Sequence, residues 1–85
     1  DITDLEKKLG ENPDNHEIRF SIAMSLMGKG DYENAIAQFL FIIEKDRMWK
    51  DEAPRKNLLE IFNALGPADQ LAIEGRKKLS SILFI

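Results

Sequence analysis

The side chains able to do acid–base or nucleophilic chemistry are few and scattered in this chain. His16 is the one histidine, and there is no cysteine. A zinc site needs several ligands of these types, and a serine nucleophile needs a histidine base held beside it. The serines are Ser21, Ser25, Ser80 and Ser81. Nothing in the sequence brings His16 close to any of them, so we interpret His16 as a surface residue at a helix start.

Four carboxylates lie close together in the sequence, at Glu44, Asp46, Asp51 and Glu52. Their spacing lacks the Asp-x-Asp-x-Asp-Gly pattern of a calcium-binding loop. Helix caps and ion pairs account for them better than a metal does. The sequence therefore predicts no metal, no cofactor and no enzymatic activity.

The charge distribution limits the classes of partner that the chain is expected to bind. A formal net charge of −3 argues against nucleic acid, since a phosphate-binding surface is normally basic. The basic clusters at 7–8 and 76–78 are short, and we interpret them as solvated helix faces. No run approaches the roughly 20 apolar residues of a membrane span, and the first residues do not resemble a signal peptide. Together with the lack of cysteine, these features predict a cytoplasmic protein that binds neither nucleic acid nor membrane.

The helices that must position any binding surface are clearest in the middle of the chain. Apolar residues recur at helical spacing over 15–29 and again over 32–45, which predicts two amphipathic helices. Gly30 is expected to end the first helix in a left-handed conformation, and Asp31 to cap the second. The two helices then form an antiparallel hairpin.

Weaker patterns predict three further helices, over 4–11, about 51–65 and about 68–83. Asp14 and Asp51 are the expected N-caps of the helices that follow them. No segment alternates with a period of two over a useful length, so the fold class is all-α.

The last two predicted helices carry three further expectations. Gly75 interrupts a helix, and we expect another backbone to come close to it. The end at 82–85 is too apolar to remain in solvent, so it should dock on the body of the domain or on a partner. The buried stripe of the preceding helix is predicted to be Leu58, Leu59, Ile61, Phe62 and Leu65.

Internal repetition is the most informative pattern. Pro13 lies 34 residues before Arg47, and Gly66 lies 36 residues after Gly30. Two extra residues fit inside 47–50, which leaves a period of 34. That period, with helix–turn–helix units, is typical of tetratricopeptide repeats.

Residue types within the first hairpin also fit this repeat. Ala35 stands at the small position where the two helices touch, and Phe39 at the large one. Arg19 departs from the usual tryptophan, and Arg47 from the usual closing proline.

The repeat register predicts one tetratricopeptide-like domain over 1–85, a helical hairpin array of about five antiparallel helices. Residues 1–13 are the tail of a preceding repeat, 14–47 a full repeat, and 48–85 a degenerate capping repeat.

Several segments show a more specific likeness. The chain resembles the C-terminal helical domain of bacterial thioredoxin-like co-chaperones of the chaperedoxin type. The likeness covers nearly the whole chain, and its most specific parts are the Asp-Arg-x-Trp step and the Arg-Lys-Lys-Leu-Ser segment. The matching segments are Asn12-Pro13-x-Asn15, Arg19, Gly30-Asp31-Tyr32-x-x-Ala35, Asp46-Arg47-x-Trp49, 58–66 and 76–84.

This resemblance implies that the chain is a fragment that follows a thioredoxin-like domain. It also implies a co-chaperone that holds unfolded clients and passes them to folding chaperones. The implied partners are therefore proteins: unfolded clients, chaperones and the protein's own thioredoxin-like domain.

Seven residues are candidates for binding a partner. Repeat geometry turns Phe20, Met24 and Met27 toward the inner face of the array, where flexible methionines suit varied apolar partners. The alternative is that these side chains pack against neighbouring helices. Trp49 either fills the inter-repeat turn or anchors a partner. The corresponding inner positions of the next repeat include Lys56, Asn57 and Glu60.

Two other roles compete with that of a binding module. The domain could be purely structural, with its apolar faces packed on its own thioredoxin-like domain or on a second copy in a homo-oligomer. It could also be the accessory domain of an enzyme, presenting a catalytic partner encoded upstream.

Overall fold

The computed structural model describes residues 2–84, which form five α-helices and no strand. The all-α prediction is confirmed, and the array of five helices is consistent with tetratricopeptide-like hairpins. The helices are α1 (Ile2–Glu11), α2 (His16–Gly28), α3 (Tyr32–Lys45), α4 (Trp49–Leu65) and α5 (Gln70–Leu83).

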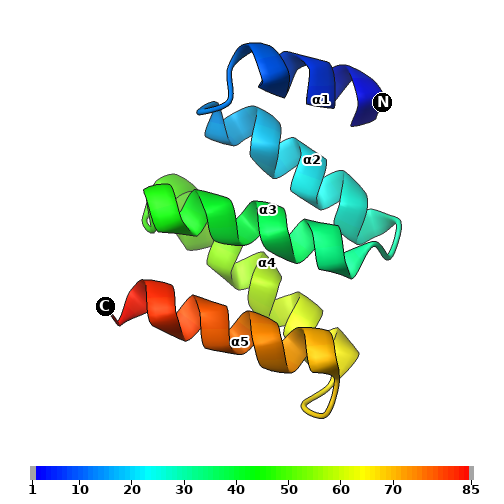
Figure 1. Ribbon diagram of the computed structural model, residues 1–85, viewed down its shortest axis with the longest axis vertical. Coiled ribbons are helices and arrows are strands. Elements are labelled where there is room, and N and C mark those ends of the chain that lie inside the picture. The colour runs from blue at the N-terminus through cyan, green and yellow to red at the C-terminus, as the bar shows by residue number, and fades with distance from the viewer. Residues whose placement is uncertain (1, 85) are drawn as a thin grey trace.

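The helices form an array in which each packs on the next along the chain. α1, α2 and α3 lie side by side, α4 crosses behind α3, and α5 lies beside α3 (Figure 1). α3 also packs directly on α5, so it contacts three other helices. The core is therefore built around α3.

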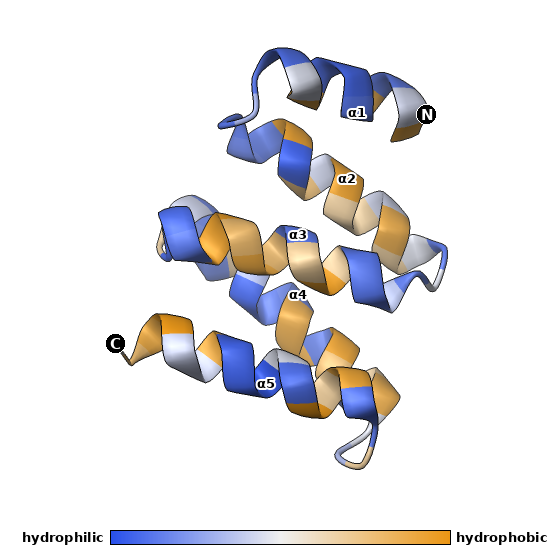
Figure 2. Cartoon of the chain, in the orientation of Figure 1, coloured by the Kyte–Doolittle hydropathy of each residue, from blue (hydrophilic) through white to orange (hydrophobic). Residues whose placement is uncertain are grey.

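Burial follows this arrangement. α3 supplies six of the buried residues, whereas α1 supplies none. In Figure 2 α1 is largely hydrophilic, while α3 carries a long hydrophobic stretch. The buried apolar residues are Ile22, Ala23, Ala35, Ile36, Phe39, Leu40, Ile42, Ile43, Leu58, Ile61, Phe62, Ala72 and Leu79.

The turn between α2 and α3 forms as predicted. Gly30 has a φ of +81°, and the N–H of Asp31 donates to the carbonyl of Leu26 at 2.9 Å, which closes a Schellman-type end. The Asp31 carboxylate accepts from the backbone N–H of Asn34 at 3.4 Å and from its side-chain amide at 2.9 Å. The break between α4 and α5 likewise depends on residues close together in the sequence. Gly66 has a φ of +92°, and the Asp69 side chain caps α5.

The predicted cap of α2 is wrong by one residue. Asn15, not Asp14, is the N-cap, and its side-chain oxygen accepts from the N–H of Ile18 at 3.1 Å. The N–H of Asn15 donates to the carbonyl of Asn12 at 3.0 Å, which closes a turn over Pro13 and Asp14. Because Asp14 is used inside this turn, the helix begins after Asn15.

The predicted cap of α4 is also wrong, for a different reason. Lys50, Asp51 and Glu52 have φ values of 53°, 53° and 63°, so a left-handed turn stands where Asp51 was expected to cap. The right-handed part begins after Glu52, and buried Pro54 falls in its first turn as expected. Left-handed geometry costs an L-residue roughly 1–2 kcal/mol. Trp49 and Lys50, at the start of this turn, contact α2 as described below.

Replacing Asp51 by glycine should therefore stabilise the domain. Glycine adopts a φ of 53° without the Cβ penalty, and relief of that penalty exceeds its entropic cost, so we expect a gain of about 0.5–1 kcal/mol. Glu60→Gly, at an exposed position in the right-handed part of α4, should lose about 1 kcal/mol. Thermal unfolding followed by circular dichroism measures both changes. Equal losses in the two variants would mean that Asp51 lies in an ordinary helix.

Three expectations about the last two helices need correction. Leu59 is 36% exposed, so it lies outside the buried stripe that Leu58, Ile61 and Phe62 form. A Cβ on Gly75 would meet the ring of Phe62 rather than another backbone. At the C-terminal end, Ile82 and Leu83 pack against the core but Phe84 is 82% exposed; residue 85 lies outside the described residues.

Among residues 2–84, no helix has the length and apolar character to span a membrane.

Candidate functional site

An aromatic cluster joins α2, α3 and the start of α4. The Phe20 ring lies edge-on to Phe39, with ring centroids 5.8 Å apart, and edge-on to Trp49 at 5.5 Å. Phe39 is fully buried, whereas Phe20 and Trp49 are half-buried. The cluster therefore connects the core to the surface at the N-terminal end of α2.

An ion pair covers this cluster. The ammonium of Lys50 lies 3.3 Å from the Glu17 carboxylate, and it sits 5.6 Å from the Phe20 ring centroid and 5.5 Å from that of Trp49. Both charged side chains are largely exposed, so the pair itself contributes little to stability. The pair connects the start of α4 to the start of α2.

The two methionines on α2 differ in exposure. Met24 is 41% exposed, one helical turn after Phe20 on the same side of α2. Met27 is partly buried and packs against the core. Met24 is thus the more available of the two methionines to a partner, one turn after the half-buried Phe20.

The three predicted residues on α4 are less alike than the sequence suggests. Lys56 and Glu60 are exposed. Asn57 is half-buried, and its side-chain amide donates to the carbonyl of Ala53 at 3.0 Å. Asn57 is therefore committed to its own helix, which leaves Lys56 and Glu60 as the polar groups presented by this stretch.

His16 is not the simple surface residue that the sequence suggests. Its ring lies edge-on to Trp49, with centroids 5.8 Å apart, and the residue is half-buried. Its Nδ1 is buried and has no hydrogen-bond partner within residues 2–84. No sequence signal points to this pair, because 33 positions separate the two residues.

Arg19, at the position where the repeat usually has tryptophan, takes the place of an aromatic ring. Its guanidinium stacks 3.6 Å from the Phe41 ring centroid and donates to the Gln38 side chain at 2.7 Å and to the Pro13 carbonyl at 3.0 Å. Burial lowers the pKa of Arg19, and the Asp14 carboxylate partly opposes this shift. A planar cation thus fills the space between α2 and α3 and ties both to the preceding turn.

Within residues 2–84, no group of three or more histidine or carboxylate side chains is placed to hold a metal ion. Two of the clustered carboxylates act locally, as expected. Asp46 accepts from the N–H of Met48 at 3.2 Å, and Glu52 pairs with Arg55 at 3.0 Å.

Comparison with known proteins agrees with the helical array and its repeat. No curated protein sequence matches the chain. A family model described as tetratricopeptide repeat matches residues 1–84. Domains of this kind generally mediate protein–protein interaction. The chain belongs to the tetratricopeptide repeat family.

Proposed function

We propose that this domain is the protein-binding part of a bacterial, cytoplasmic, thioredoxin-like co-chaperone, and that it holds unfolded segments of client proteins. The observation that carries the proposal is the exposed side chain of Met24, one helical turn after Phe20, whose half-buried ring contacts that of Trp49. This set of residues, together with Met27, is called the α2 face below. The resemblance of the Asp46–Trp49 and 76–84 segments to such co-chaperones supports the same assignment.

The proposed mechanism is stoichiometric binding, with no covalent step. Methionine is unbranched and polarizable, so the α2 face can adapt to apolar side chains of different shapes. Burying one methionine side chain stabilises a complex by roughly 1.5–3 kcal/mol. Lys56 and Glu60 on α4 are exposed and would contact polar parts of the client. Docking on a folding chaperone would be a separate step, after client capture.

A fluorescent polypeptide kept unfolded by carboxymethylation tests this proposal by anisotropy. Met24→Glu should weaken binding at least about tenfold, because it removes apolar contact and buries a charge. Met48→Glu is the matched control, since Met48 is 62% exposed and lies outside the α2 face. We expect the control to bind within about twofold of the parent. Equal loss in both variants, or in neither, would contradict client binding at the α2 face.

The alternative is an assembly role, in which the apolar faces pack on the protein's own thioredoxin-like domain or on a second copy. The predicted division into 1–13, 14–47 and 48–85 is compatible with either role. Sedimentation velocity separates the two. A tight homodimer that Met24→Glu dissociates would favour assembly over client binding.

A further inference from the structure

A positively charged side chain of the chain itself lies against the aromatic rings of the α2 face. The Lys50 ammonium lies over the rings of Phe20 and Trp49, 5.6 Å and 5.5 Å from their centroids. It is also 3.3 Å from the Glu17 carboxylate. Aromatic faces and a carboxylate are groups that bind organic cations in proteins. Glu17, Phe20 and Trp49 therefore form a cation site, called the aromatic–acid site here.

Lys50 is held in this site only weakly. Its side chain is 47% exposed and that of Glu17 is 66% exposed, so water competes for both charges. Among the described residues, Glu17 is the one hydrogen-bond partner of the ammonium. A lysine side chain is a flexible four-carbon stem, so its ammonium can move into solvent while the backbone stays in place. An incoming cation can therefore displace it.

A guanidinium group fits such a site better than an ammonium does. On the Phe41 ring, the guanidinium of Arg19 stacks 3.6 Å from the centroid, whereas the ammonium of Lys45 lies 5.5 Å away. A guanidinium can stack flat on a ring and can donate two parallel hydrogen bonds to a carboxylate, and it is less strongly hydrated than an ammonium. Arginine is therefore the side chain expected to displace Lys50.

The aromatic–acid site lies on the same side of α2 as the exposed Met24. Glu17, Phe20 and Met24 are spaced i, i+3 and i+7, which places them in one row along the helix. Glu17 and Met24 are roughly 10 Å apart along the helix axis. In the polyproline II conformation, common in unfolded chains, residues i and i+3 lie on one side, about 9 Å apart. One unfolded segment can therefore reach both Met24 and the aromatic–acid site.

We propose that the aromatic–acid site binds an arginine side chain of the client segment, and that Lys50 occupies the site when no client is bound. The arginine is three positions from the apolar residue that contacts Met24. The proposal rests on the proposed function and names a class of client, unfolded segments in which an arginine accompanies apolar residues. Because Lys50 competes for the site, an arginine without apolar neighbours binds too weakly to remain.

Two peptides that differ in one side chain test the site. Both are fluorescent, unstructured and about 12 residues long, with several apolar residues. The first has an arginine three positions before a leucine, and the second has citrulline there, which has a similar shape but no charge. Binding of the citrulline peptide reports the apolar contacts, and the ratio of the two affinities reports the aromatic–acid site. Anisotropy at low salt should show about threefold tighter binding of the arginine peptide.

Variants at positions 50 and 17 should change this ratio in opposite directions. Lys50→Gln removes the competing ammonium, so the preference for the arginine peptide should rise to about tenfold. Glu17→Gln removes the carboxylate, so the two peptides should bind within about 1.5-fold of each other. Glutamine, like lysine, is not β-branched, so the left-handed turn that begins at position 50 tolerates it.

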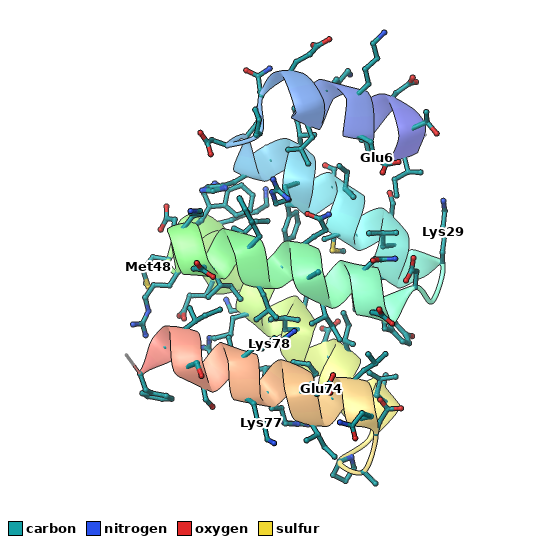
Figure 3. All side chains as sticks on the ribbon, viewed as in Figure 1. Glu6, Lys29, Met48, Glu74, Lys77 and Lys78 are labelled. Atoms are coloured by element: carbon teal, nitrogen blue, oxygen red, sulfur yellow. The ribbon has the colours of Figure 1, made fainter. Side chains whose placement is uncertain are left out.

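Glu33→Gln and Lys77→Gln are the matched controls, because each changes the net charge as its test variant does. Glu33 is the second residue of α3, as Glu17 is of α2, and both are exposed. Lys77 is exposed on α5, and Figure 3 shows α3 between that helix and α2. Both controls should keep the preference at about threefold. Circular dichroism checks that all four variants keep the parent helical content.

Three results would overturn the proposal: equal affinities for the two peptides in Lys50→Gln, a preference that Glu17→Gln leaves unchanged, or one that Glu33→Gln lowers as much as Glu17→Gln does. A homodimer in sedimentation that Glu17→Gln dissociates would assign the site to a basic side chain of a second copy, and would also overturn it.

Failure of this proposal is distinguishable from failure of the proposed function. The citrulline peptide does not use the charge of Glu17, so its binding should persist in Glu17→Gln and weaken in Met24→Glu. Equal binding of both peptides that Met24→Glu weakens would overturn the arginine site alone. Binding of neither peptide would overturn the arginine site, and the carboxymethylated polypeptide then decides the proposed function.

Discussion

Phe39→Ala should lower the free energy of unfolding by about 3–5 kcal/mol, the range for removing a buried phenylalanine side chain. Phe39 is fully buried, with an exposed fraction of 0%. Its ring is the inner member of the aromatic cluster that joins α2 to α4 through Phe20. A chain of 85 residues is expected to have roughly 4–13 kcal/mol of total stability. The substitution therefore removes a large share of it.

Urea unfolding followed by far-ultraviolet circular dichroism measures this loss. Phe84→Ala is the matched control, because the same atoms are removed from a side chain that is 82% exposed, and it should change stability by less than about 0.5 kcal/mol. The emission of Trp49, the only tryptophan, should shift to the red in Phe39→Ala as the cluster loosens. A loss similar to that of the control would show that the cluster is not a structural junction.

Gly75→Ala should destabilise the domain even though alanine is the better helix former. A Cβ at this position would lie 2.5 Å and 2.8 Å from the Cε1 and Cζ atoms of Phe62. The Phe62 side chain is fully buried, so its ring has no free space into which to move. Over-packing costs roughly 1–3 kcal/mol against a gain of about 1 kcal/mol in helix propensity, so we expect a net loss of up to about 2 kcal/mol.

A double-mutant cycle tests the cause of this loss. Phe62→Leu removes the ring that meets the new methyl group, so Gly75→Ala should be tolerated better in that background, with a coupling of about 1 kcal/mol. Gly10→Ala is the control for propensity alone, since a Cβ at Gly10 meets nothing within 4 Å. It should leave stability unchanged or raise it. Additive effects at positions 75 and 62 would refute the steric explanation.

Most helix ends could be predicted because their signals are local. A glycine in a left-handed conformation followed by an aspartate places the α2–α3 turn at Gly30 and Asp31, through hydrogen bonds that span five residues or fewer. At the break between α4 and α5, Gly66 is again left-handed, and the Asp69 side chain accepts a hydrogen bond from the N–H of Leu71. The prediction of caps failed at Asp14, which lies inside the turn before α2, and at Asp51, which lies in a left-handed turn beside Trp49 and Lys50, two residues that contact α2.

The candidate site could be predicted only in part. Helical periodicity predicted that Phe20, Met24 and Met27 lie on one side of α2. It did not predict that Met24 is exposed and Met27 partly buried. No pattern in the sequence indicates the His16–Trp49 pair or the depression lined by side chains of α3 and α5. Both depend on the angle and spacing between helices, which no short segment specifies.

The sequence by itself determined the all-α class, the tetratricopeptide-like character and most of the helix ends, because backbone hydrogen bonds and apolar spacing act within a few residues. Tertiary structure alone decided that Leu59 faces solvent, that Gly75 accommodates the ring of Phe62, and that Lys50, Asp51 and Glu52 form a left-handed turn. It also decided that side chains of α3 and α5 line a depression between the two helices. These features arise where helices meet, because side-chain volumes and charges from distant parts of the chain must fit together there.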